Sequence, residues 1–288
     1  MSKIIGCIDG SVYADSVSYY SAWLHERTGL PIELLHVVAP HSEIVVRGDL
    51  SGQIGVSSNS NLLEKLTKID EEHGKLEQSK GKLMLDHAQQ ELTNKGIEAL
   101  QAKQLRGSVV ATIEENEKDA QVLVIGKRGE HHQYSQNNLG SNLEKIARRI
   151  HKPLFITTEQ IKPIEKFLVC YDGSPSANKA INYIAKSSML KGIECHLLKV
   201  DEATESACKL LEEAKSKLED VGFKVISSLQ QGKLIDVVMH EYIHTHVIDL
   251  LVMGSYGHSK IRSFFLGSTT TTLIQKTDIP LLLFRKDI

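Results

Sequence analysis

Glycines and hydroxyl residues near the end of the chain have a spacing that suits phosphate binding. Gly254 and Gly257 follow an apolar run, nine residues separate Gly257 from Gly267, and Ser268 and Thr269 come directly after Gly267. Glycines let backbone N–H groups approach phosphate oxygens without a side chain in the way. The hydroxyls would add donors at a helix N-terminus, where unpaired amides and the helix dipole favour an anion. The spacing predicts a polyphosphate site.

A similar set occurs earlier, but with ten residues rather than nine between the second and third glycines: Gly126, Gly129, Gly140 and Ser141. The additional residue could be absorbed as a bulge, or it could displace the amides from a phosphate. Lys127 and Arg128 could compensate by facing the phosphate with their charge. The other interpretation, in both halves, is that the glycines only shape a turn from a strand into a helix.

Two aspartates lie in equivalent places. Asp9 and Asp172 each end an apolar run and precede Gly-Ser. Each side chain could contact a ligand, or it could cap the following helix or turn. Both interpretations stay open from the sequence.

These residues belong to an internal repeat. KIIGCIDGS at 3–11 resembles KFLVCYDGS at 166–174, and VLVIGKRG at 122–129 resembles LLVMGSYG at 250–257. One repetition of this length indicates two copies of a whole domain. We predict a first domain over 1–158, with an insertion at about 39–75, and a second over 163–288.

Each half alternates short runs rich in Val, Ile and Leu with segments of helical periodicity, which predicts an α/β fold with a doubly wound, five-stranded parallel sheet. Ligands of such sheets bind beyond the carboxyl ends of the strands, where the strand order reverses. We therefore expect the aspartates and glycines to meet at one edge. The expected strands lie near 3–8, 32–38, 97–105, 121–126 and 153–158, then 166–171, 193–200, 223–230, 249–254 and 280–285; second-half helices lie near 175–190, 203–221, 233–246 and 267–277.

The insertion leads into a long charged helix that Gly74 and Gly81 weaken. Apolar residues recur on it at steps of three, four and seven residues, which lie on one face of a helix. The helix could pack along this stripe as a surface elaboration, or it could be a partner-binding arm. The stripe comprises Leu62, Leu66, Ile69, Leu76 and Leu83.

The aspartate after the first strand and the G-x2-G-x9-G-[ST] pattern after the fourth are similar to those of the universal stress protein family. Both halves carry the likeness, so the chain resembles a tandem universal stress protein. The resemblance implies a Rossmann-like fold of the adenine nucleotide alpha hydrolase-like type, and ATP, alone or with Mg²⁺, as ligand. Family members without the motif bind no nucleotide. Fifth strands pair across a dimer in this family, so 153–158 and 280–285 should pair within this chain as an intramolecular pseudo-dimer.

The resemblance also implies roles for individual residues. In the second half, Asp172 and the backbone of Val200 would face adenine, and Met253 and Gly254 would lie by the ribose. The phosphates would be held by Gly257, Gly267, Ser268 and Thr269. The corresponding residues of the first half are Asp9, Val37, Gly126, Gly129, Gly140 and Ser141.

Composition argues against several classes of function. With 34 Lys and Arg against 36 Asp and Glu, the chain lacks the basic surface of a nucleic-acid-binding protein. It has no apolar run of the length that a membrane span needs, and its start does not resemble a signal peptide, so we expect a cytoplasmic protein. The four cysteines form no CxxC pair and are expected to be buried, reduced thiols.

One segment spells HExxH, the pattern of a zinc hydrolase: His240, Glu241 and His244. On the expected helix, however, the two histidines point away from the apolar face, so we expect them in solvent and expect no metal centre. P-loop and G-x-S-x-G patterns are absent, and we assign no catalytic residue.

The sequence favours a stress-response module that uses ATP or a related adenine nucleotide as a regulatory ligand. Two alternatives remain: a nucleotide-free module that binds a hydrophobic ligand or a protein partner, and a slow ATP hydrolase or autophosphorylating enzyme. Edge strands and the insertion leave room for homo-oligomers beyond the pseudo-dimer.

Overall fold

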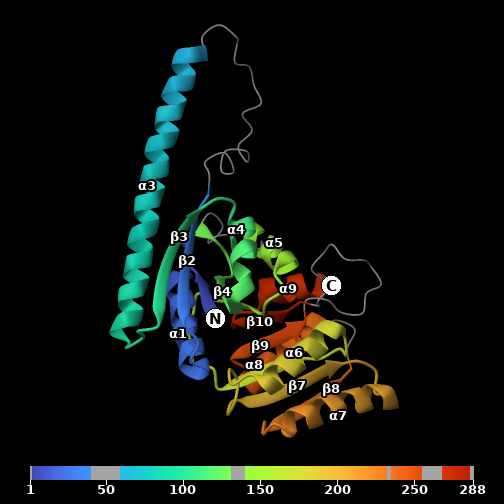
Figure 1. Cartoon of the computed structure of the whole chain (residues 1–288). Helices are drawn as coiled ribbons and strands as arrows, with labels where there is room; N and C mark the ends of the chain where they lie inside the picture. Colours follow the sequence, from blue (N-terminus) through green and yellow to red (C-terminus); the bar gives the residue numbers. More distant parts are fainter. Residues whose placement is uncertain (1, 40–58, 131–139, 232–234, 255–267, 286–288) are drawn as a thin grey trace.

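The computed structural model describes residues 2–39, 59–130, 140–231, 235–254 and 268–285. Within them, the chain forms ten strands in one sheet, in the order β3-β2-β1-β4-β5-β10-β9-β6-β7-β8 (Figure 1). Each half contributes five parallel strands, which confirms the predicted α/β fold of two similar domains. The strands are β1 Lys3–Cys7, β2 Ile32–Val38, β3 Leu100–Arg106, β4 Ala120–Gly126, β5 Leu154–Thr157, β6 Lys166–Cys170, β7 Glu194–Val200, β8 Val225–Gln230, β9 Leu250–Gly254 and β10 Leu281–Phe284.

Helices cover both faces of the sheet. Neighbouring residues of a buried strand point to opposite faces, so that Ile4 belongs to one apolar cluster and Ile5 to the other. The first cluster is covered by α1 Ala14–Thr28, α3 Asn59–Asn94, α6 Pro175–Lys186 and α7 Glu205–Glu219. The second is covered by α4 Val109–Asn116, α5 Ser141–Arg149, α8 Ile235–His246 and α9 Ser268–Lys276. Each apolar layer therefore runs through both domains.

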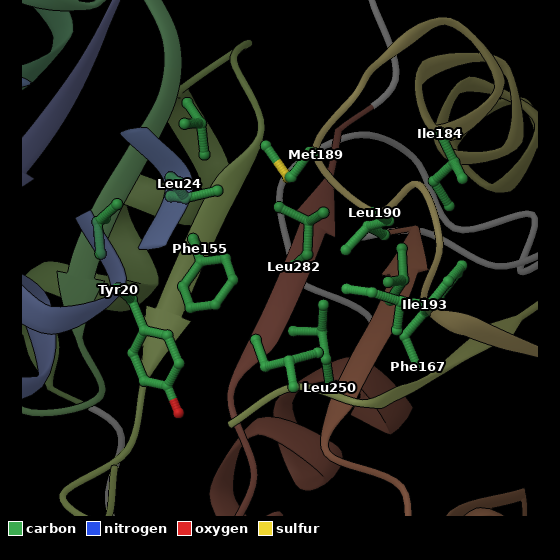
Figure 2. Packing of buried hydrophobic residues seen from close by; sticks show 14 of the residues in the cluster. Tyr20, Leu24, Phe155, Phe167, Ile184, Met189, Leu190, Ile193, Leu250 and Leu282 are labelled. Atoms are coloured by element: carbon green, nitrogen blue, oxygen red, sulfur yellow. The ribbon is translucent and has the colours of Figure 1, made fainter. Parts of the chain in front are cut away.

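The two domains join by strand pairing. β5 and β10 are antiparallel, with Phe155 opposite Leu282, which confirms the predicted pairing of the two fifth strands. Phe155 is fully buried, and its ring centroid lies 5.1 Å from that of Tyr20. In Figure 2, Phe155 and Tyr20 of the first domain lie in the same apolar layer as Leu282 and Met189 of the second. The chain thus forms an intramolecular pseudo-dimer with a shared core.

The long helix α3 exists as predicted, but the predicted packing stripe is wrong. Ile69, Leu76 and Leu83 are 58%, 63% and 70% exposed. The side chains of Leu62 and Leu66 lie outside the described residues. The helix instead packs through Leu85, Ala88 and Leu92, on its opposite side, and its N-terminal part extends past the sheet (Figure 1).

Gly81 accounts for the face through which α3 packs on the sheet. A Cβ atom on Gly81 would lie 2.4 Å from Cδ2 of His36 and 2.5 Å from Nε2 of Gln104. Gly81 therefore lets α3 approach β2 and β3 more closely than the larger stripe residues would allow. The periodicity of large apolar residues therefore predicts the wrong packing face for α3, because its closest contact with the sheet is made by a glycine.

All four cysteines are free thiols, and the prediction that they are buried is confirmed for Cys195 alone: Cys7 and Cys170 are partly buried, and Cys208 is exposed on α7. Burial, with a smaller contribution from Asp9, raises the pKa of the Cys7 thiol to about 12. Burial likewise raises the pKa of Cys170 and Cys195. Thiols with raised pKa values stay protonated and are poor nucleophiles.

None of the helices in the described ranges is long and apolar enough to cross a membrane.

Candidate functional site

The strand order places the predicted residues of each domain at one edge. In the second domain β6 lies between β7 and β9, and Cys170 of β6 is in register with Leu198 and Met253. The chain leaves β6 toward β7 on one side and returns to β9 on the other, so the strand order reverses here. The edge beyond these three strand ends gathers Asp172, Val200, Met253 and Gly254.

The first domain repeats this arrangement. β1 lies between β2 and β4, with Cys7 in register with Leu35 and Gly6 in register with Val124. The corresponding edge gathers Asp9, Val37 and Gly126.

Both aspartates shape the turn into the next helix. The Asp172 carboxylate accepts the backbone N–H of Ser174 at 2.9 Å, and Gly173 between them has a φ of +77° that favours glycine. Ser174 in turn caps α6 by accepting the N–H of Ala177 at 3.2 Å. In the first domain, the Asp9 carboxylate accepts both the backbone N–H and the hydroxyl of Ser11. The structure thus shows both aspartates stabilising a turn, which is one of the two roles that the sequence left open.

Gly254 permits a close approach of helix and strand. A Cβ atom there would lie 2.4 Å from the Ser176 hydroxyl and 2.9 Å from the Ala177 amide nitrogen. The N-terminus of α6 therefore lies directly against the end of β9, whereas the partly exposed Val200 and the buried Met253 belong to the apolar layer on the other face of the sheet. Gly126 plays the same part in the first domain, where a Cβ atom would lie 2.6 Å from Cβ of Tyr13.

The first-domain loop brings its glycines to the aspartate. A Cβ atom on Gly129 would lie 3.2 Å from an Asp9 carboxylate oxygen, and one on Gly140 would lie 3.5 Å from the Gly129 nitrogen. Helix α5 begins at Ser141, directly after Gly140. The amides that open α5 thus lie at the same edge as Asp9, although the side chain of Ser141 is outside the described residues.

The second-domain loop is only partly described. Gly257 and Gly267 lie outside the described residues, as do the side chains of Ser268 and Thr269. The backbone of α9 begins at Ser268, the position where the spacing predicts a helix N-terminus.

An acidic side chain that the sequence did not single out lies at the first-domain edge. A Cβ atom on Gly10 would lie 2.8 Å from the carboxyl carbon of Glu130, so this carboxylate rests against the turn after β1. Lys80 of α3 forms an ion pair with Glu130. The two residues are separated by 50 positions, so no local pattern could have paired them. The carboxylate would repel an anion at this edge.

The two basic residues of the same loop form hydrogen bonds within the protein. The Lys127 ammonium donates a hydrogen bond to the Thr277 carbonyl of the second domain at 2.8 Å, and it is buried. Arg128 donates to the Tyr13 hydroxyl at 3.1 Å. In this conformation Lys127 belongs to the interface between the domains rather than to a phosphate.

The buried lysine predicts a pH dependence. Burial, with a smaller contribution from the Arg128 charge, lowers the pKa of Lys127 from 10.5 to about 8. Between these values the unfolded chain binds more protons than the folded one, so the free energy of unfolding should rise with pH. We expect this rise in wild type and not in Lys127→Met, which has no group to titrate there. Denaturant titrations from about pH 7.5 to 10.5 measure the free energy of unfolding of both proteins. The value for wild type minus that for Lys127→Met should rise with pH, and a difference that stays constant or falls would refute the lowered pKa of Lys127.

A cleft of about 220 Å³ adjoins Asp9, Gly10 and Ser11. Its other walls come from α1 and from α3, including Met84 and Ala88. Small-molecule sites commonly have about 300–1,000 Å³, so this cleft is small for a nucleotide. It shows that the long helix helps to form the wall beside the first-domain edge.

The HExxH segment lies on α8. His240 and His244 are exposed, as the sequence predicts. Among the residues for which coordinates are described, no three His, Cys, Asp or Glu side chains gather in a way that could hold a metal ion.

Sequence comparison shows that the chain is similar to universal stress proteins. The model of the universal stress protein family matches residues 1–158 and 202–285. A universal stress protein of Synechocystis sp. is 36% identical over 288 residues, covering 99% of this chain and all of the relative. A universal stress protein of Methanocaldococcus jannaschii is 33% identical over 90 residues, which cover 30% of this chain and 52% of the relative.

Solved structures share the fold over the whole chain. A universal stress protein from Archaeoglobus fulgidus superposes with a TM-score of 0.71 at 19% identity, covering 99% of this chain and 98% of the other. A protein of the same description from Pseudomonas aeruginosa gives 0.64 at 13% identity, covering 100% and 94%. At these identities the likeness concerns the fold alone.

Proposed function

The chain belongs to the universal stress protein family, and we propose that it binds ATP or a related adenine nucleotide at the strand-end edge of its second domain. The nucleotide serves as a regulatory ligand in a cytoplasmic stress response, and no catalytic residue is assigned. The observation that carries the proposal is the meeting of Asp172, Val200 and Gly254 at the reversal of strand order, from which the glycine loop departs.

The proposed contacts follow from this placement. Adenine lies against the turn of Asp172 and the backbone of Val200, and the ribose lies by Met253 and Gly254. The loop glycines Gly257 and Gly267 present backbone amides to the phosphates, with Ser268 and Thr269 at the opening of α9 adding hydroxyl donors and helix-terminal amides. Mg²⁺ accompanies the phosphates and neutralises part of their charge.

We propose that the two domains differ in their affinity for the nucleotide. In the first domain the Glu130 carboxylate rests against Gly10, and the ammonium of Lys127 is bound to Thr277. A nucleotide entering this edge would have to displace or neutralise Glu130, whose ion pair with Lys80 also holds it in place. We therefore assign the stronger nucleotide site to the second domain.

Calorimetry with MgATP tests the proposal on the whole chain. Wild type is expected to bind one nucleotide tightly, and Gly257→Val is expected to lose at least about tenfold in affinity, or 1.4 kcal/mol, because its side chain obstructs the phosphates. The matched variant Gly129→Val changes the equivalent glycine of the first domain and should keep the tight site.

Other outcomes separate the alternatives. If wild type gives no heat with MgATP, the nucleotide proposal fails and the alternative of a module for hydrophobic ligands or protein partners gains support. If ATP binds and phosphate is released or transferred in a way that Ser268→Ala abolishes, the role as a ligand alone is wrong.

A further inference from the structure

Helix α8 carries two histidines one turn apart on its exposed side. Residues four positions apart lie on the same face of a helix, so His240 and His244 project together. Their Nε2 atoms are 3.2 Å apart, and their ring centroids are 4.3 Å apart. Both side chains are exposed, so an ion can reach the two nitrogens from solvent.

The separation of the nitrogens matches that of two ligands on one metal ion. Imidazole nitrogens that each lie about 2.0 Å from a zinc ion, at a tetrahedral angle, are about 3.3 Å from one another. The observed 3.2 Å is within a tenth of an ångström of this value. The two rings now share a hydrogen bond, and a metal ion between the nitrogens would replace it without moving the helix backbone.

We propose that His240 and His244 form a two-ligand site for a divalent transition-metal ion of the Cu²⁺, Ni²⁺ and Zn²⁺ class. Both nitrogens bind the ion as neutral imidazoles, and water fills the remaining coordination positions. Imidazole suits these metals, and affinity for a given nitrogen site rises toward Cu²⁺ in the divalent series. The site lies on α8 and does not depend on the nucleotide proposal.

The surroundings define a binding site rather than a hydrolytic centre. Asp236, one turn before His240, has a carboxylate oxygen bound to the Lys276 ammonium at 3.0 Å. A catalytic zinc takes three protein ligands, whereas the described part of the chain gathers no third one here. We therefore assign Glu241 of the HExxH pattern no catalytic role, and the pair acts as a metal chelate.

A Cu²⁺ titration of the metal-free whole chain, followed by electron paramagnetic resonance, tests the site. We expect wild type to show one Cu²⁺ ion coupled to two imidazole nitrogens. Joining two ligands on one scaffold makes the second binding step intramolecular, and avidity gains of this kind start at about 100-fold. His240→Ala and His244→Ala should therefore each bind Cu²⁺ about 100-fold more weakly and lose the two-nitrogen signal.

A matched control is His87→Ala, which removes an exposed histidine from α3. It should keep the affinity and the spectrum of wild type. The proposal is overturned if wild type shows no two-nitrogen site, if His240→Ala keeps the wild-type affinity, or if His87→Ala weakens binding as much as the α8 variants do.

Discussion

Replacing Phe155 with alanine is expected to lower the free energy of unfolding by about 3–5 kcal/mol, the usual cost of removing a fully buried aromatic side chain. Phe155 is completely buried on β5, beside Tyr20 and Trp23 and opposite Leu282 of the second domain. The cavity would therefore open where the two domains meet. Trp23 is the only tryptophan of the chain, and its ring centroid is 6.3 Å from that of Phe155. The fluorescence of Trp23 therefore reports unfolding of the core beside β5, where the two domains meet.

The measurement is urea unfolding followed both by Trp23 fluorescence and by circular dichroism. Coincident transitions are expected in wild type, because the core is shared, and separated transitions in Phe155→Ala, because the domains no longer unfold together. Phe223→Ala is the matched control. Phe223 is also buried, but it packs against Phe167 within the second domain, so that variant should leave the native fluorescence unchanged. A loss below about 1 kcal/mol in Phe155→Ala would contradict the shared core.

Replacing Gly81 with alanine is expected to destabilise the protein, although alanine favours helices. The new Cβ would lie 2.4 Å from a carbon of His36, whose ring is buried and hydrogen-bonded to the Ile8 carbonyl at 2.8 Å. Overpacking of this kind costs about 1–3 kcal/mol, which exceeds the gain of about 1 kcal/mol from helix propensity. Chemical unfolding measures the net loss, and α3 should become more sensitive to proteolysis.

Gly74 provides the control with the opposite sign. It lies on the same helix, and the nearest atom to a Cβ placed there is 3.8 Å away, which is ordinary contact. Gly74→Ala should therefore stabilise the chain by about 0.5–1 kcal/mol through helix propensity alone. If both alanine variants shift stability in the same direction, the close approach at Gly81 does not hold α3 in place.

Much of the fold could be predicted because its signals are local. Buried strands such as β2 and β7 are short apolar runs, and their observed ends differ by at most one residue from the predicted ones. The repeat of two domains and the gathering of Asp9 and Asp172 at strand ends follow from the same patterns. The pairing of β5 with β10 could be expected only from the family resemblance, because no local signal selects the partner of an apolar strand.

The remaining features depend on contacts between distant residues. The packing face of α3 is decided by Gly81 against His36, a contact that apolar periodicity does not register. The ion pair of Lys80 with Glu130 and the hydrogen bond of Lys127 to Thr277 join segments 50 and 150 residues apart. These contacts belong to the first-domain edge, and a comparison of the two glycine patterns does not predict them.

The most direct test of the proposed function is native mass spectrometry of the gently purified whole chain. We predict one adenine nucleotide per chain, retained in Gly129→Val and lost in Gly257→Val. Wild-type protein that carries no adenine nucleotide and takes up none from added MgATP would contradict the account.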